Sequence, residues 1–337
     1  MNGPTRRQKS QAQRIFGEEE DVEKLYLAAA EKGDVHTLEY VLKIESLDVN
    51  CVDRKGNTAL NLAIKHGHVD AMKCLLRHDV YIGDSLLRAV DVQTFRGVQI
   101  LCEYSKTFKG RSINIINCRS DNEDFHPDIT PLVLAAHHNN YDIIKILLRH
   151  SASIDDPESI NRVTEKHTLQ HSLGTLNVYK ALASEAYISL TNEDPIDKAF
   201  KLSVKLRDMS TRDYEFRQDY IDLSERCEQF AADLLGQTRD TQELTTILTH
   251  GKTSQGDSDL PYKVFHAVKL EQKLFVAHPH CQQLLIERWY HGLSNWRDKS
   301  MLQTVPISIA IGFAYPLLSL LYILAPCGRL AKFITIP

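Results

Sequence analysis

The sequence has no grouping of residues that signals catalysis. Neither a G-x-G-x-x-G nor an H-E-x-x-H motif occurs, and no Ser/His/Asp or Cys/His arrangement stands out. The seven cysteines are widely spaced, which favours free thiols in a reducing compartment over a disulfide framework. The formal net charge is -4 at pH 7, so no excess of positive charge attracts nucleic acid. We therefore predict a protein that is not an enzyme and has no nucleic-acid partner.

Two short segments match known sites only in part. Gly251–Thr253 reads Gly-Lys-Thr, like the end of a phosphate-binding loop, but Thr246 stands where that loop needs a glycine. His278–Cys281 brings three potential metal ligands together, yet a site needs a fourth ligand, and its proline suits the first turn of a helix. We expect a helix to begin there, and we predict no cofactor and no metal.

The clearest pattern in the chain is Asp128–Ile154, which has the form of an ankyrin repeat. Thr130 suits a helix cap and is followed by a proline at the first helical position. A second helix is predicted over Asp142–Leu148, with apolar residues at core spacing. The residues predicted to build this repeat and its stacking core are Leu132, Ala135, Leu147 and Leu148.

Alanines that can be aligned with Ala135 predict further repeats before this one. Ala29 and Ala63 are 34 positions apart, close to the ankyrin period of about 33. Ala89 follows after only 26 positions, which is too few for a full hairpin finger, so we expect a tight turn at Gly83 instead. Ala135 lies 72 positions after Ala63, which leaves room for this one irregular repeat. We predict four ankyrin repeats, with generic helical hairpins as the alternative.

After the repeats the helical pattern becomes longer and less regular. Helices are predicted over Leu176–Ser184, from Pro195 to Met209, and over Asp213–Leu235, with shorter ones beyond. The fold class is therefore all-α: an ankyrin-repeat solenoid, a linker-helix domain and a C-terminal hydrophobic elbow. The predicted parts are a disordered tail (residues 1–21), four ankyrin repeats (22–154), a loop (155–175), the linker-helix domain (176–292) and the elbow (293–337).

The sequence contains one long run without charge, between Lys299 and Arg329. That run exceeds the roughly 20 apolar residues that span a bilayer. Prolines and a glycine interrupt it, and basic residues flank both ends, which favours the cytoplasmic side for each end. We therefore predict an elbow that contacts the membrane through residues 301–328, with one ordinary transmembrane helix as the alternative. The polar N-terminus predicts no signal peptide.

Four residues are predicted to anchor or bend this region. Both tryptophans of the chain, Trp289 and Trp296, precede the apolar run. Tryptophan is favoured at membrane–water boundaries because its ring is amphipathic. For Trp289, a place in the core of a helical bundle is an equal alternative. Gly312 and Pro316 are predicted to bend the elbow.

Several stretches together resemble the N-terminal cytosolic part of the TRPC subfamily of transient receptor potential cation channels. The matching stretches are Ala136–Leu148, Tyr179–Ser184, Glu193–Ile196 and, above all, Phe275–Trp296 (FVAHPHCQQLLIERWYHGLSNW). The order of repeats, linker helices and elbow also fits this subfamily. Family members carry a histidine and three cysteines after the fourth repeat, which look like a zinc site. The corresponding loop here, Pro157–His171, contains no cysteine, so no zinc is expected.

The resemblance implies the assembly and regulatory region of a calcium-permeable, non-selective cation channel. It implies gating downstream of phospholipase C-coupled receptors and association with other channel subunits as a homo- or heterotetramer. The implied location is the plasma membrane, with residues 1–300 on the cytoplasmic side. No pore is present in the sequence. The alternative is a stand-alone ankyrin scaffold, or a short form that regulates channel assembly.

Overall fold

The computed structural model describes most of the chain as helices. The described residues are 19–44, 47–78, 80–107, 115–119, 125–155, 157, 169–250, 261–291, 305–306, 308–309 and 312–313. Within them, the only strand-like pairing is an isolated antiparallel bridge between Val52 and Thr58. The all-α fold class is confirmed. The chain divides after Leu234 into two compact units, which are described one at a time.

The first unit is built from consecutive pairs of antiparallel helices. The pairs that correspond to the predicted repeats are α2 (Glu19–Lys32) with α3 (Val35–Val41), α4 (Ala59–Lys65) with α5 (Val69–Leu76), α6 (Ser85–Asp91) with α7 (Phe95–Thr107), and α8 (Pro131–His137) with α9 (Tyr141–Arg149). A short 3-10 turn, η1 (Ile115–Asn117), precedes α8. Because α2 begins at Glu19, the last three residues of the predicted disordered tail are helical, as suits acidic residues in a first helical turn.

The same reversal joins the two helices of each repeat. A backbone N–H just before the second helix donates to a buried alanine carbonyl five residues earlier. These bonds run from Asp34, His68, Thr94 and Asn140 to Ala29, Ala63, Ala89 and Ala135, at 2.9, 2.9, 3.0 and 3.2 Å. The residue before each donor has a positive φ, which explains the glycines at two of these turns. The alanines aligned in the sequence therefore do occupy equivalent positions.

The third repeat is shortened as its spacing predicts. Only eight residues separate the end of α5 at Leu76 from the start of α6 at Ser85. Gly83 turns the chain there with φ +42°. By contrast, the second repeat has a finger in which the Asp53 carboxylate accepts from the N–H groups of Lys55 and Asn57, at 2.8 and 2.7 Å. The aspartate thus fixes the finger turn through its own side chain.

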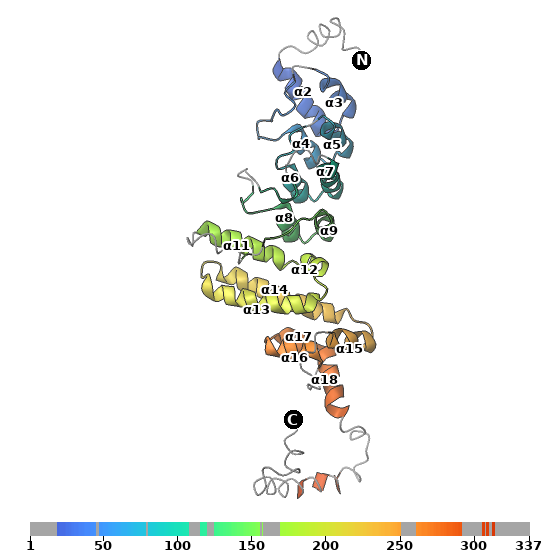
Figure 1. The fold of residues 1–337 in the computed structure, drawn as a ribbon, viewed down its shortest axis with the longest axis vertical. Helices are drawn as coiled ribbons and strands as arrows, with labels where there is room; N and C mark the ends of the chain where they lie inside the picture. Colours follow the sequence, from blue (N-terminus) through green and yellow to red (C-terminus); the bar gives the residue numbers. More distant parts are fainter. Residues whose placement is uncertain are drawn as a thin grey trace. The chain divides into compact units, whose positions relative to one another are not determined.

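The stack does not end with the fourth repeat. The next pair, α11 (Leu169–Leu182) with α12 (Glu185–Thr191), continues it, because α11 packs against α8 and α12 against α9. Figure 1 shows α4, α6 and α8 in one column and α5, α7 and α9 in the neighbouring one. Two long helices, α13 (Pro195–Arg212) and α14 (Arg217–Gly236), follow. The Ser224 hydroxyl on α14 donates to the Ser203 carbonyl on α13 at 3.0 Å, so small residues let these helices approach closely.

One predicted boundary in this unit is wrong. The expected loop over residues 155–175 was to be followed by a helix from Leu176, but α11 already begins at Leu169. The first turns of α11 contain few large apolar residues, which hid them from a search for periodicity. They face the fourth repeat with polar and small side chains instead: Gly174 and Thr175 are buried, and the Thr175 hydroxyl donates to the His171 carbonyl at 3.0 Å.

The second unit contains shorter helices: α15 (Thr241–Thr249), α16 (Tyr262–Lys269), α17 (Lys273–Ala277) and α18 (Pro279–His291). The chain reverses between α16 and α17. Glu271 has φ +57°, and the Gln272 N–H donates to the Ala267 carbonyl at 2.9 Å. This is the same five-residue reversal that joins the ankyrin helices.

The His278–Cys281 segment begins a helix, as its proline predicts. Pro279 is the first residue of α18, and the His280 ring lies 3.1 Å from the Thr238 hydroxyl and 3.2 Å from the Leu235 carbonyl. Burial raises the pKa of the Cys281 thiol to about 12, so this thiol stays protonated at neutral pH. These side chains are therefore used in packing and hydrogen bonding within the second unit.

Little of the predicted membrane elbow lies in the described residues. Trp289 is in α18, where its side chain is outside the description, and Trp296 and Pro316 lie outside the described residues altogether. Gly312 is described, and a β-carbon at that position would meet no atom within 4 Å. Among the helices that the structure describes, none is both long and apolar enough to cross a membrane.

Candidate functional site at the end of the ankyrin stack

The predicted core residues of the fourth repeat lie where the two helix columns meet. Leu132 and Ala135 on α8 and Leu147 on α9 are 0% exposed, and Leu148 is half-buried. The Thr130 hydroxyl caps α8 by accepting from the Val133 N–H at 3.4 Å. The cap fixes where α8 begins, and the period of the apolar residues places one face of each helix against the stack.

A single asparagine holds the next helix pair in place. Asn139 lies in the turn between α8 and α9 with φ +52°. Its side-chain oxygen accepts from the Ser184 hydroxyl at 2.8 Å and from the Ala186 N–H at 2.9 Å. Ser184 in turn caps α12. Asparagine suits this turn twice over, because it tolerates the left-handed conformation and offers a hydrogen-bond acceptor.

A histidine at the end of α8 makes a second link, to α11. The His137 ring Nε2 lies 2.8 Å from the carbonyl oxygen of Asn177 on α11. Burial, as the largest cause, lowers the pKa of this imidazole below its ordinary value. The ring is therefore neutral at pH 7, and the carbonyl partner requires the tautomer in which Nε2 carries the proton.

The lowered pKa of His137 predicts a pH-dependent stability. The unfolded chain binds a proton at this ring more readily than the folded chain does. The contribution of neutral His137 to the free energy of unfolding is thus complete above pH 6.5 and is lost as the pH falls below that value. In urea unfolding, we expect the midpoint to drop less between about pH 7.5 and 5.5 for His137→Gln than for the parent chain. An equal drop in both proteins would contradict the assignment.

Histidines at the repeat turns reach across to neighbouring layers of the stack. His137 is half-buried, and the His68 ring lies 3.0 Å from the Glu31 carbonyl of the preceding repeat. Both therefore bridge neighbouring layers of the stack. The signal in the sequence was their position at repeat turns, where a ring can reach the next helix.

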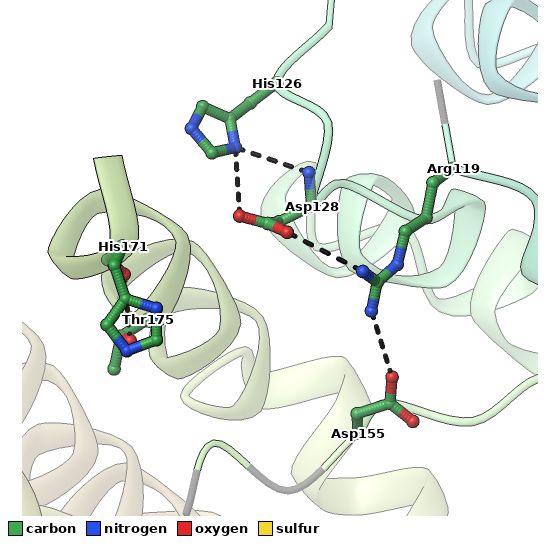
Figure 2. Close-up of polar contacts among 6 residues, drawn as sticks. All are labelled: Arg119, His126, Asp128, Asp155, His171 and Thr175. Atoms are coloured by element: carbon green, nitrogen blue, oxygen red, sulfur yellow. Dashed lines mark hydrogen bonds and ion pairs between the residues drawn. The ribbon is translucent and has the colours of Figure 1, made fainter. Parts of the chain in front are cut away.

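A polar cluster lies on the other side of the junction between the fourth repeat and the α11–α12 pair (Figure 2). The Arg119 guanidinium lies 3.8 Å from the Asp128 carboxylate and 3.4 Å from the Asp155 carboxylate. The His126 ring lies 3.6 Å from Asp128. On α11, His171 faces a small cleft of about 60 Å³ between this cluster and the helix. The Arg119 guanidinium pairs with both carboxylates, so the cluster ties the loop segments together.

Close approach at this cluster depends on a glycine in α11. A β-carbon at Gly174 would lie 2.4 Å from a carboxylate oxygen of Asp128. Any side chain there would push the aspartate away from Arg119 and His126. The glycine therefore lets the helix pack directly over the polar cluster.

The described residues contain no group of three His, Cys, Asp or Glu side chains that could hold a metal ion. The loop in which the resembling family carries its zinc ligands, Pro157–His171, lies mostly outside the description. The described cysteines are free thiols, and burial raises the pKa of Cys102 to about 11 and of Cys227 to about 12. What the junction offers is a set of hydrogen bonds between helix layers.

Comparison with known families finds two matches that lie side by side in the sequence. Residues 25–157 match the family model described as "Ankyrin repeats (3 copies)". Residues 159–217 match the one described as "Transient receptor ion channel II". The boundary between them falls at the junction held by Asn139 and His137.

The chain is also similar to several curated proteins over nearly its whole length. It is 38% identical over 331 residues to "Short transient receptor potential channel 4" of Mus musculus, covering 94% of this chain and 34% of that protein. It is 35% identical over 332 residues to "Transient-receptor-potential-like protein" of Drosophila melanogaster, covering 94% and 30%. It is 38% identical over 328 residues to "Transient receptor potential-gamma protein" of the same species, covering 92% and 29%. The chain thus spans about a third of the length of these relatives.

Proposed function

Because the chain belongs to the TRPC type of transient receptor potential channels, we propose that it is the assembly and regulatory region of a calcium-permeable, non-selective cation channel. The similarity to channel proteins over 94% of the chain carries this proposal. It covers the ankyrin stack and the following helices alike. The region would bring subunits together as a homo- or heterotetramer.

The junction supports a role in assembly for physical reasons. A solenoid whose layers contact only their neighbours stays extended, and it presents long surfaces to other chains. Asn139 and His137 extend this order from the fourth repeat into α11 and α12. Leu132, Ala135, Leu147 and Leu148 would act structurally, by keeping the layers stacked.

We further propose that the channel opens downstream of phospholipase C-coupled receptors. The proposed location is the plasma membrane, with residues 1–300 on the cytoplasmic side and residues 301–328 in contact with lipid. Relatives that are channels support this placement.

Receptor-evoked calcium influx tests the proposal. The 337-residue chain would be expressed in cells that also express a full-length subunit of the family. We expect the chain to enter mixed complexes and to lower the calcium influx that follows receptor stimulation. A Leu147→Ala chain expressed at the same level should lower it less. Unchanged influx, at a level of the parent chain that matches the full-length subunit, would contradict the proposal.

The membrane contact gives a separate prediction. Replacing Trp296 by alanine should weaken the flotation of the chain with liposomes, because an amphipathic ring is lost next to the apolar run. Flotation would be compared across a range of lipid concentrations. Flotation equal to that of the parent chain would show that Trp296 does not anchor the elbow.

A further inference from the structure

A hollow of about 610 Å³ opens across three consecutive layers of the stack. Its lining comes from α6, α8 and α11, the first helices of their pairs, together with the segment just before α8. Leu134 is 8% exposed, and Phe125 is half-buried. These two side chains give the hollow an apolar floor large enough to receive a side chain from another molecule.

The rim of the hollow is mainly basic. Arg88 comes from α6 and the exposed Lys180 from the last turn of α11. The one carboxylate in the lining is Asp91, and it lies 3.6 Å from the His138 ring. The hollow therefore combines a positive rim with an apolar floor.

The arrangement of the cations indicates what would fit. They stand on different layers of the stack, α6 and α11, and a carboxylate lies among them. A compact phosphorylated headgroup needs cations that converge on one point without a competing anion. A stretch of polypeptide can instead place carboxylates at intervals and an apolar side chain between them.

We propose that this hollow binds an acidic segment of a partner protein. Carboxylates of the segment lie against Arg88 and Lys180, and an apolar side chain of the segment covers Phe125 and Leu134. Charge complementarity gives the segment its orientation along the stack. This interaction does not require that the chain assemble with channel subunits.

Fluorescence anisotropy tests the proposal with the 337-residue chain. The probe is a fluorescein-labelled decapeptide that alternates glutamate with leucine, and the matched probe has glutamine in place of each glutamate. We expect the glutamate peptide to bind more tightly, and its binding to weaken as salt is added. Lys180→Glu should weaken binding roughly tenfold or more, because like charges then face each other.

Two further variants separate this site from general attraction. Lys65→Glu changes an exposed lysine in the last turn of α4, outside the lining of the hollow, and should leave binding unchanged. Asp91→Asn removes the carboxylate from the hollow and should tighten binding severalfold, which a misfolded protein would not do. The chain would also be mixed with phosphatidylserine vesicles.

Three results would overturn the proposal. The first is equal affinity for the two peptides. The second is an equal loss of binding in Lys65→Glu and Lys180→Glu. The third is binding to the vesicles that depends on Lys180 without binding to the glutamate peptide, which would assign the hollow to a membrane surface.

Discussion

Replacing Leu147 by alanine is expected to lower the free energy of unfolding by about 2–5 kcal/mol. The side chain is 0% exposed between the two helix columns of the fourth repeat. Its removal loses apolar burial and leaves a cavity that the surrounding helices fill only in part. Urea denaturation followed by circular dichroism would measure the change.

The next residue provides the matched control. Leu148 has the same chemistry on the same helix but is half-buried. Leu148→Ala should therefore cost clearly less than Leu147→Ala. Equal costs would mean that α9 is rotated from the position described here.

Replacing Asn139 by alanine is expected to cost about 2–3 kcal/mol. The change removes the acceptor of two hydrogen bonds and leaves the Ala186 N–H at the start of α12 without its partner. It also places alanine in a left-handed turn that asparagine tolerates better. Hydrogen exchange should show faster exchange in α12 before the ankyrin helices are affected.

Gln93 separates the two contributions to the Asn139 effect. It lies in the equivalent turn between α6 and α7 with φ +58°, close to the +52° of Asn139. Gln93→Ala therefore shares the conformational cost but not the loss of the link to α12. If both variants lost the same stability, the link between the fourth repeat and α12 would contribute nothing.

The repeats could be predicted because their spacing is set by packing. Ala29, Ala63, Ala89 and Ala135 recur where the first helix of each pair is most closely surrounded, and their carbonyls accept equivalent hydrogen bonds. The short third repeat was visible for the same reason, since an interval of 26 residues has no room for a finger. Periodicity also identified Leu132 and Leu147 as core residues.

The junction could not be predicted, because it is made by polar groups. Asn139 lies in a turn, and nothing in the sequence marks Ser184 or Ala186 as its partners. The first turns of α11 were missed because Gly174 and Thr175 pack against a polar cluster, where no apolar period exists. Hydrogen bonds between residues far apart in the chain produce no regular spacing of residue types that a sequence search could detect.

Within the first unit, the five helix pairs from α2–α3 to α11–α12 form one stack of alternating columns. This continuity means that a change at one layer reaches its neighbours through direct contacts. A stack of this kind is suited to hold channel subunits together, and the basic hollow over α6, α8 and α11 would let a second protein act on the same stack.

Counting subunits tests the assembly claim most directly. The 337-residue chain and a full-length subunit of the family would each carry a different fluorescent label, and single complexes in the cell membrane would be bleached step by step. We predict complexes that contain both labels and four chains in total. Chains that are always single and never coincide with the full-length subunit would contradict the assignment of this region to channel assembly.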